Sequence, residues 1–221
     1  KGKEIPENSI LAFKEAIKNG YGIELDIRES KDKEIVVFHD DTLNRICYDK
    51  REVENLTFEE LQNFTLYKTL QKIPLFKDVL KLLTSKTPLL IEIKKHKNIG
   101  VLEKNLSLIL DDFDGTFLVC SFEVDVMNWF LKNRADIKRA LIFGDIEIKK
   151  QKLKNLLFLS RFYRSKPLIL SLDYNLLDDG FILNFCKKRS IPAISWTINS
   201  QKKMEKAKKI ASNVIFERIK F

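Results

Sequence analysis

The chain has 221 residues, of which 44% are hydrophobic, and its 40 basic and 31 acidic residues give a net charge of +9. This composition excludes a disordered chain, and the length suits one large domain, which we expect to cover residues 1–221. No apolar run approaches the ~18 residues that a membrane-spanning helix needs, so stable membrane insertion is not expected. Three widely spaced cysteines indicate reduced thiols and a cytoplasmic location. A chain that begins at Lys1 leaves a periplasmic or secreted origin open.

The first predicted elements are a helix and a β-hairpin. Asn8 or Ser9 can cap a helix whose apolar face extends to a stop signal at Gly20. Two apolar runs follow, at residues 22–28 and 35–40. The few residues between them cannot form a crossover between parallel strands, so the link must be a hairpin.

Acidic residues mark the first strand of this hairpin. Glu24 and Asp26 are two apart, so both carboxylates project from one face of the strand. Two like charges in a buried place require a cation, and Mg²⁺ or Ca²⁺, which prefer oxygen ligands, are the candidates. A turn centred on Asp32 and Lys33 would place His39 opposite Asp26, which favours a metal site beside an acid/base histidine. An edge hairpin with exposed acids and a surface histidine accounts for the same residues equally well.

Apolar strands alternate with helices along the rest of the chain. Helices are predicted at 57–61, 75–83, around 101–110, around Met127 to Leu131, in a Lys-rich stretch, near 178–188 and at 200–211. Strands are predicted at 89–94, 117–122, 139–143, 168–172, 193–196 and 213–216. This alternation predicts a parallel sheet covered by helices, an α/β fold of the (β/α)8 TIM-barrel type. With residues 22–27 there are seven parallel candidates, so the first strand of the barrel is expected upstream of Lys1, missing or truncated here.

Polar residues fall late in several predicted strands: Glu24, Asp26, Glu92, Lys94, Ser121 and Trp196. The carboxyl ends of barrel strands meet at one mouth, where catalytic groups sit. Glu92 would bring a third carboxylate, enough for a divalent ion that also accepts a phosphate, and Lys94 would be a partner for that phosphate. A self-satisfying ion pair between Glu92 and Lys94 is the alternative. Ser121 and Trp196 are candidates for binding substrate, although a neutral strand-end serine and a core aromatic explain them too.

Motifs in a definite order cover nearly the whole chain: Pro6-Glu7-Asn8 with Ala12-Phe13, Glu24-Leu25-Asp26, Ser30-Lys31-Asp32, His39-Asp40 with Leu43 and Arg45, Ile73-Pro74, Glu92-Ile93-Lys94, Ser121-Phe122 and Trp196-Thr197-Ile198-Asn199. In these motifs the chain resembles the glycerophosphodiester phosphodiesterases of the phospholipase-C-like superfamily. The resemblance implies a metal site made by Glu24, Asp26 and Glu92. It also implies that His39 is one of two catalytic histidines, that Lys94 lies near the phosphate and that Trp196 lines the pocket.

Three features depart from the family pattern. The family's opening His-Arg-Gly, which carries the other histidine and a phosphate-binding arginine, should lie a few residues before Lys1. Asp32-Lys33 stands in place of Asp-Gly at the hairpin turn, and Phe216-Glu217-Arg218 in place of Thr-Asp-x-Pro. His96, the only other histidine, is expected to be a surface residue in a loop and not a substitute.

The resemblance implies a metal-dependent hydrolase with Mg²⁺ or Ca²⁺ as cofactor. It would cleave small glycerophosphodiesters, such as glycerophosphocholine or glycerophosphoethanolamine, to glycerol 3-phosphate and an alcohol. The nucleophile could be water or a glycerol hydroxyl. The alternatives are a lysophospholipase-D-like enzyme on lipid substrates, for which no apolar patch is clearly encoded, and a catalytically impaired phosphate-binding barrel. Nucleic acid is not expected as a partner, because the lysines lie on helical faces without an RNA-binding signature; the oligomeric state is left open.

Overall fold

The structure, a computed structural model, describes residues 4–144 and 147–219. Contacts divide the chain into two compact units, Lys1–Val119 and Cys120–Phe221, which are described in turn. Among the described residues, no helix is both long enough and apolar enough to cross a bilayer. The expectations of one domain over residues 1–221 and of a further strand upstream of Lys1 stay predictions.

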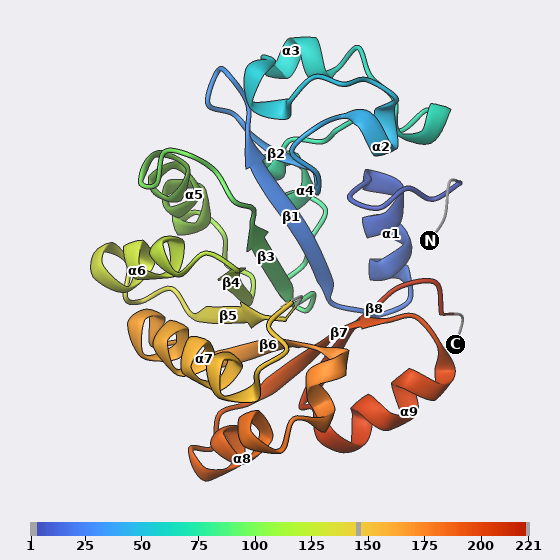
Figure 1. The fold of residues 1–221 in the computed structure, drawn as a ribbon. Helices are drawn as coiled ribbons and strands as arrows, with labels where there is room; N and C mark the ends of the chain where they lie inside the picture. The colour runs from blue at the N-terminus through green and yellow to red at the C-terminus, as the bar shows by residue number, and fades with distance from the viewer. Residues whose placement is uncertain (1–3, 145–146, 220–221) are drawn as a thin grey trace. The chain divides into compact units, whose positions relative to one another are not determined.

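The first unit is built on a short sheet. Helix α1 (Ile10–Lys18) precedes strand β1 (Ile23–Glu29), which pairs antiparallel with β2 (Ile35–Val37) and parallel with β3 (Leu89–Ile93) (Figure 1). The remaining elements are α2 (Asn44–Cys47), the 3₁₀ turns η1 (Val53–Asn55) and η2 (Leu66–Lys68), α3 (Phe58–Leu61), α4 (Phe76–Leu80) and α5 (Val101–Asp111). Strand β4 (Phe117–Ser121) spans the boundary between the two units.

Local sequence explains how these helices begin. The Ser9 hydroxyl accepts a hydrogen bond from the Ala12 N–H, so Ser9 and not Asn8 caps α1. At α3 the Thr57 side chain accepts from the Glu60 N–H and the Glu60 carboxylate from the Thr57 N–H, which is the predicted capping box. Long buried side chains of the segment between β2 and α4, among them Phe38, form an apolar core beside the hairpin.

The hairpin register differs by one residue from the prediction. Ile27 pairs with Val37, and the Phe38 N–H donates to the Asp26 carbonyl at 2.9 Å, so Phe38 and not His39 lies opposite Asp26. The cause is the turn. A two-residue turn of type I′ would need φ > 0 at both central residues. The observed three-residue loop, closed by a hydrogen bond from the Ser30 N–H to the Glu34 carbonyl, needs it only at Lys33, where φ is 68°. His39 therefore follows the strand and begins the next loop.

The second unit is a parallel sheet with helices in the connections. Strands β5 (Arg139–Phe143), β6 (Ile169–Asp173), β7 (Ala193–Ile198) and β8 (Asn213–Phe216) pair in sequence order, all parallel. Helix α6 (Val124–Asn133) precedes β5. The connections between the strands contain α7 (Gln151–Ser165), then η3 (Tyr174–Asp178) with α8 (Gly180–Lys188), and then α9 (Gln201–Ile210). Phe158 on α7 packs edge-to-face against Phe143 and Phe185, with ring centroids 5.1 Å apart in both pairs. This aromatic cluster fixes α7 and α8 against the sheet.

The predicted alternation of strands and helices is confirmed across both units. The helix predicted at residues 75–83 is shorter in the structure, where α4 covers only Phe76–Leu80. There the Leu82 and Leu83 N–H groups donate to the Val79 and Leu80 carbonyls, three residues back, so the helix tightens into a turn.

Candidate functional site

Three carboxylates meet on neighbouring strands of the first unit. Glu24 and Asp26 project from β1, and the parallel register of β1 and β3 pairs Asp26 directly with Glu92. One carboxylate oxygen of each of the three residues lies within 4.8 Å of the other two. The gathering of acids that the sequence predicts is therefore present, and it requires no contribution from the second unit.

Lys94 pairs with two of these carboxylates. Its Nζ lies 2.5 Å from Glu92 Oε1 and 3.3 Å from Asp26 Oδ1, so the alternative ion pair of Glu92 with Lys94 is also present. Burial and the charge of Asp26 raise the pKa of Glu92 despite Lys94. Burial acts to lower the pKa of Lys94, but Asp26 and Glu92 outweigh it and raise that pKa. Three carboxylates this close together offer the oxygen ligands that a hard divalent ion prefers.

Asn8 orients the Asp26 carboxylate. The Asn8 amide donates to Asp26 Oδ2 at 2.7 Å, and its side-chain oxygen accepts from the Asp26 N–H at 3.2 Å. The residue is buried and has φ of 54°, a left-handed conformation that asparagine adopts more readily than most residues. Sequence analysis singled out Asn8 in the Pro6-Glu7-Asn8 motif, but only as a possible helix cap. It did not predict the hydrogen bonds of Asn8 with Asp26.

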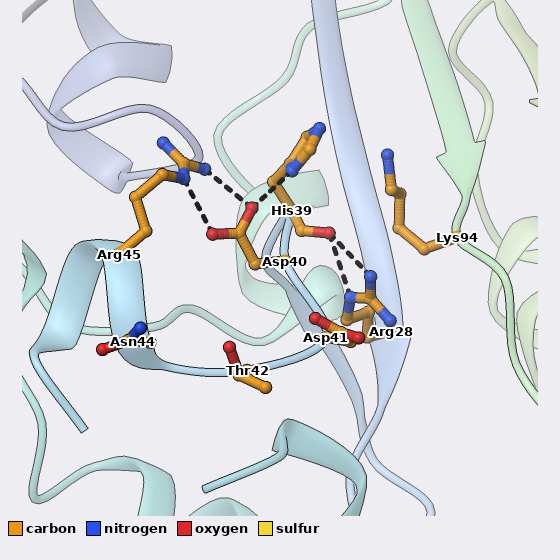
Figure 2. Close-up of a pocket in the computed structure, with 8 residues that line it drawn as sticks. All are labelled: Arg28, His39, Asp40, Asp41, Thr42, Asn44, Arg45 and Lys94. Carbon is orange, nitrogen blue, oxygen red and sulfur yellow. Dashed lines mark hydrogen bonds and ion pairs between the residues drawn. The ribbon is translucent and has the colours of Figure 1, made fainter. Parts of the chain in front are cut away.

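His39 is held by a chain of charged side chains (Figure 2). Its Nδ1 lies 2.6 Å from Asp40 Oδ1, and Arg45 donates to both Asp40 oxygens at 2.7 and 2.9 Å. Glu7 in turn accepts from Arg45 at 2.5 and 3.1 Å. Burial would raise the pKa of Asp40, but the hydrogen bonds of Arg45 and His39 lower it. An ionised carboxylate accepts a hydrogen bond from Nδ1–H, which leaves Nε2 as the ring nitrogen that can take up or release a proton.

A pocket of about 400 Å³ opens beside this histidine. Eight residues line it: Arg28, His39, Asp40, Asp41, Thr42, Asn44, Arg45 and Lys94. Arg28 donates through Nε and Nη2 to the His39 carbonyl at 3.0 and 2.9 Å, which fixes the loop that carries the imidazole. The cationic side chains of Arg28, Arg45 and Lys94 suit an anionic ligand such as a phosphate. Sequence reasoning missed Arg28, although it stands two residues after Asp26 and so shares its face of β1.

Ser121 and Trp196 belong to the second unit. Ser121 is buried at the end of β4, and its hydroxyl accepts from the Glu123 N–H at 3.1 Å. The Trp196 ring packs edge-to-face against Phe122 with centroids 5.6 Å apart. A Cβ at Gly144 would lie 2.9 Å from the Trp196 ring, so the glycine gives this ring its room. The roles of Ser121 and Trp196 in binding substrate stay predictions.

His96 is not the surface residue that the sequence suggested, and this expectation is wrong. Its side chain is only 13% exposed, with Nδ1 2.9 Å from the Lys94 carbonyl oxygen and Nε2 3.0 Å from Glu103 Oε1. Glu103 is fully buried in the first turn of α5, where its other oxygen accepts from the Gly100 N–H. The loop between β3 and α5 therefore folds back onto α5. No local sequence pattern around His96 predicts this contact.

This pair makes the stability of the protein depend on pH. Burial acts to lower the pKa of His96, but Glu103 and the Lys94 carbonyl outweigh it and raise that pKa above its ordinary value of about 6.5. The charged imidazole therefore stabilises the fold fully below about pH 6.5, and its contribution is lost as the pH rises through the higher pKa of the folded state. We expect the difference in unfolding free energy between wild type and His96→Gln to be larger near pH 6 than near pH 9 in chemical denaturation. Equal differences at both pH values would contradict this assignment.

Comparison with solved structures defines the class of fold. The chain aligns with the glycerophosphodiester phosphodiesterase of Thermotoga maritima with a TM-score of 0.77 and 24% identity, covering 95% of this chain and 88% of that chain. It aligns with a phosphodiesterase of Oleispira antarctica, solved in complex with the product sn-glycerol-3-phosphate, with a TM-score of 0.83 and 18% identity over 96% and 88% of the two chains. The likeness establishes the predicted α/β fold of the TIM-barrel type.

Sequence comparison then gives the family. The glycerophosphoryl diester phosphodiesterase family matches residues 1–216. A glycerophosphodiester phosphodiesterase of Caldanaerobacter subterraneus is 28% identical over 217 residues, covering 92% of this chain and 85% of the relative. One of Bacillus altitudinis is 33% identical over 153 residues, covering 64% and 62%. The chain belongs to the glycerophosphoryl diester phosphodiesterase family, a family of enzymes that hydrolyse phosphoric diesters.

Proposed function

We propose that this protein is a metal-dependent glycerophosphodiester phosphodiesterase. Its substrates would be small glycerophosphodiesters such as glycerophosphocholine and glycerophosphoethanolamine, and its products glycerol 3-phosphate and the free alcohol. The observation that carries the proposal is the meeting of Glu24, Asp26 and Glu92 on two adjacent strands, next to Lys94. Membership of the family supports the reaction class, and the product bound to the Oleispira antarctica relative supports the substrate class.

Glu24, Asp26 and Glu92 would hold the cation, which we propose is Mg²⁺ or Ca²⁺. Three carboxylates suit these ions because both prefer oxygen ligands, and three protein ligands leave positions for a substrate oxygen. When bound, the ion supplies Lewis-acid stabilisation of the charge that grows on the phosphate.

The residues around the pocket would bind the phosphate and transfer protons. Lys94 and Arg28 bind the phosphate by charge, and His39 exchanges a proton through Nε2 because Asp40 holds Nδ1. A second histidine, from the His-Arg-Gly of the family, would be the complementary acid or base. Either water or a glycerol hydroxyl serves as the nucleophile in this scheme. Ser121 and Trp196 would line the part of the site that contacts the glycerol skeleton.

Product identity tests this proposal. Glycerophosphocholine incubated with the full-length protein and Mg²⁺ or Ca²⁺ should give glycerol 3-phosphate and choline, resolved by ³¹P NMR. Formation of phosphocholine would contradict the assigned bond cleavage. Binding of glycerol 3-phosphate without any turnover would instead indicate a phosphate-binding barrel.

Asp40 provides a prediction about how the histidine is positioned. Asp40→Asn keeps the shape of the side chain but removes the negative charge that holds Nδ1–H, so kcat should fall about 10–100-fold with little change in KM. The matched control is Asp49→Asn, which breaks a comparable pairing with Arg51 that lies off the pocket lining. Equal kcat values for the two variants would show that the Asp40 carboxylate does not position His39.

We also propose a cytoplasmic location. Cys47, Cys120 and Cys186 are all free thiols, which suits a reducing compartment.

A further inference from the structure

The net positive charge of this protein comes from one part of the chain. Residues 120–221 contain 21 basic and 10 acidic residues, a net charge of +11, whereas residues 1–119 contain 19 basic and 21 acidic residues, a net charge of −2. The basic residues are nearly as numerous in the first part as in the second. The asymmetry therefore comes from a scarcity of acidic residues in the second part, and a general enrichment in lysine does not explain it.

One stretch without acidic residues includes α7. Residues 149–166 contain seven basic residues and no acidic residue. Helix α7 lies between α6 and α8 and buries Phe158 and Ser165 against them and the sheet (Figure 1). Its opposite side, which we call the α7 outer face, consists of exposed residues that share one stripe at helical spacing: Lys152, Leu153, Leu156, Ser160, Tyr163 and Arg164.

Apolar side chains stand in the middle of this basic stripe. Leu153 is 51% exposed, Leu156 is 62% exposed and Tyr163 is 54% exposed. Single exposed apolar residues are common on proteins, but two leucines and a tyrosine lie together on this helix face. The cations of the face are Lys152 and Arg164, and Arg164 pairs with Asp125 at 2.9 Å. Together they form a basic amphipathic surface. A partner that complements this surface would carry negative charge to pair with the cations and would offer an apolar region to bury the leucines.

We propose that the α7 outer face docks onto the surface of a membrane that contains anionic phospholipids. Lipid phosphates would pair with Lys152 and its basic neighbours, and Leu153 and Leu156 would enter the boundary between headgroups and acyl chains. This is peripheral binding, and it leaves every helix outside the hydrocarbon core. Nucleic acid fits the face less well, because single strands stack on a series of planar aromatic groups and Tyr163 is the one aromatic residue of this face, whereas duplexes offer no apolar boundary for leucine. The proposal goes beyond the phosphodiesterase activity and does not depend on it.

Vesicle cosedimentation with the full-length protein tests the proposal. Vesicles of phosphatidylcholine with an equal share of phosphatidylglycerol should retain the protein at about 50 mM salt, and retention should fall at least about tenfold at about 500 mM salt because salt screens the charges. Vesicles of phosphatidylcholine alone should retain little. No retention on the anionic vesicles at the lower salt would overturn the proposal.

A matched pair of variants locates the surface. Lys152→Glu with Leu156→Ser replaces an exposed lysine and an exposed leucine four residues apart on α7. Lys104→Glu with Leu108→Ser makes the same changes at the same spacing on α5, where Leu108 is 58% exposed. We expect the α7 variant to lower the partition coefficient on anionic vesicles at least about tenfold and the α5 variant less than about twofold.

Each control has a defined meaning. Both variants should keep the wild-type circular dichroism spectrum and the wild-type hydrolysis of soluble glycerophosphocholine, since neither touches the pocket. Equal loss of vesicle binding in the two variants would overturn the assignment to α7. Retention on duplex DNA at about 150 mM salt by a protein that ignores the vesicles would overturn it in favour of nucleic acid. Failure of the phosphodiesterase proposal would appear only in the hydrolysis assay and would leave the vesicle result intact.

Discussion

Glu92→Gln should lower kcat for glycerophosphocholine about 10²–10³-fold while leaving the protein at least as stable as wild type. The activity falls because the variant removes one of the three carboxylates that we propose hold the metal ion. The stability is kept because Glu92 is buried beside Asp26, whose charge raises the pKa of Glu92, and a neutral amide relieves this repulsion. Lys94 keeps Asp26 as a partner at 3.3 Å. Turnover at saturating Mg²⁺ and the thermal unfolding midpoint measure the two effects.

The control for this experiment is Glu59→Gln. Glu59 is exposed in the first turn of α3, and we expect its replacement to change neither turnover nor unfolding. Wild-type turnover of Glu92→Gln would remove Glu92 from the proposed site. A loss of activity together with a marked loss of stability would show that the carboxylate supports the fold and not the reaction.

His39→Ala should lower kcat about 10²–10⁴-fold, the range typical of a lost acid/base group, with little effect on stability. The imidazole is 49% exposed, so removing it creates no cavity in the core.

His96→Gln should behave in the opposite way. It should keep most of the activity but lower the unfolding free energy near pH 6 by about 3 kcal/mol, because the fully buried Glu103 loses its charged partner.

The two histidines thus form a matched pair for separating reaction from fold. Single-turnover hydrolysis and urea denaturation of both variants give the necessary four measurements. Undiminished turnover in His39→Ala, or an equal loss of stability in both variants, would contradict the roles assigned to them.

The sequence predicts most of the fold because short-range patterns encode it. Apolar runs bounded by turn residues mark the strands, and capping residues such as Thr57 mark the helix starts. The acidic cluster could also be predicted. Glu24 and Asp26 share a face because side chains alternate along a strand. Glu92 joins them because the neighbouring parallel strand β3 pairs Glu92 with Asp26.

The parts that sequence reasoning missed depend on conformation or on distant contacts. The hairpin register was wrong by one residue because the left-handed φ of Lys33 decides between a two-residue and a three-residue turn. The Glu7–Arg45 contact joins residues 38 apart in the chain, and the burial of His96 depends on Glu103 in the following helix. Periodicity carries no information on such pairs, since it reports only which face of an element is apolar.

Chelation tests the central claim most directly. After treatment with excess chelator, the full-length protein should hydrolyse glycerophosphocholine only at the background rate, and added Mg²⁺ or Ca²⁺ should restore turnover in wild type but not in Glu92→Gln. Undiminished turnover in the presence of the chelator would contradict the account, because the reaction would then proceed without a metal ion between the acids of β1 and β3.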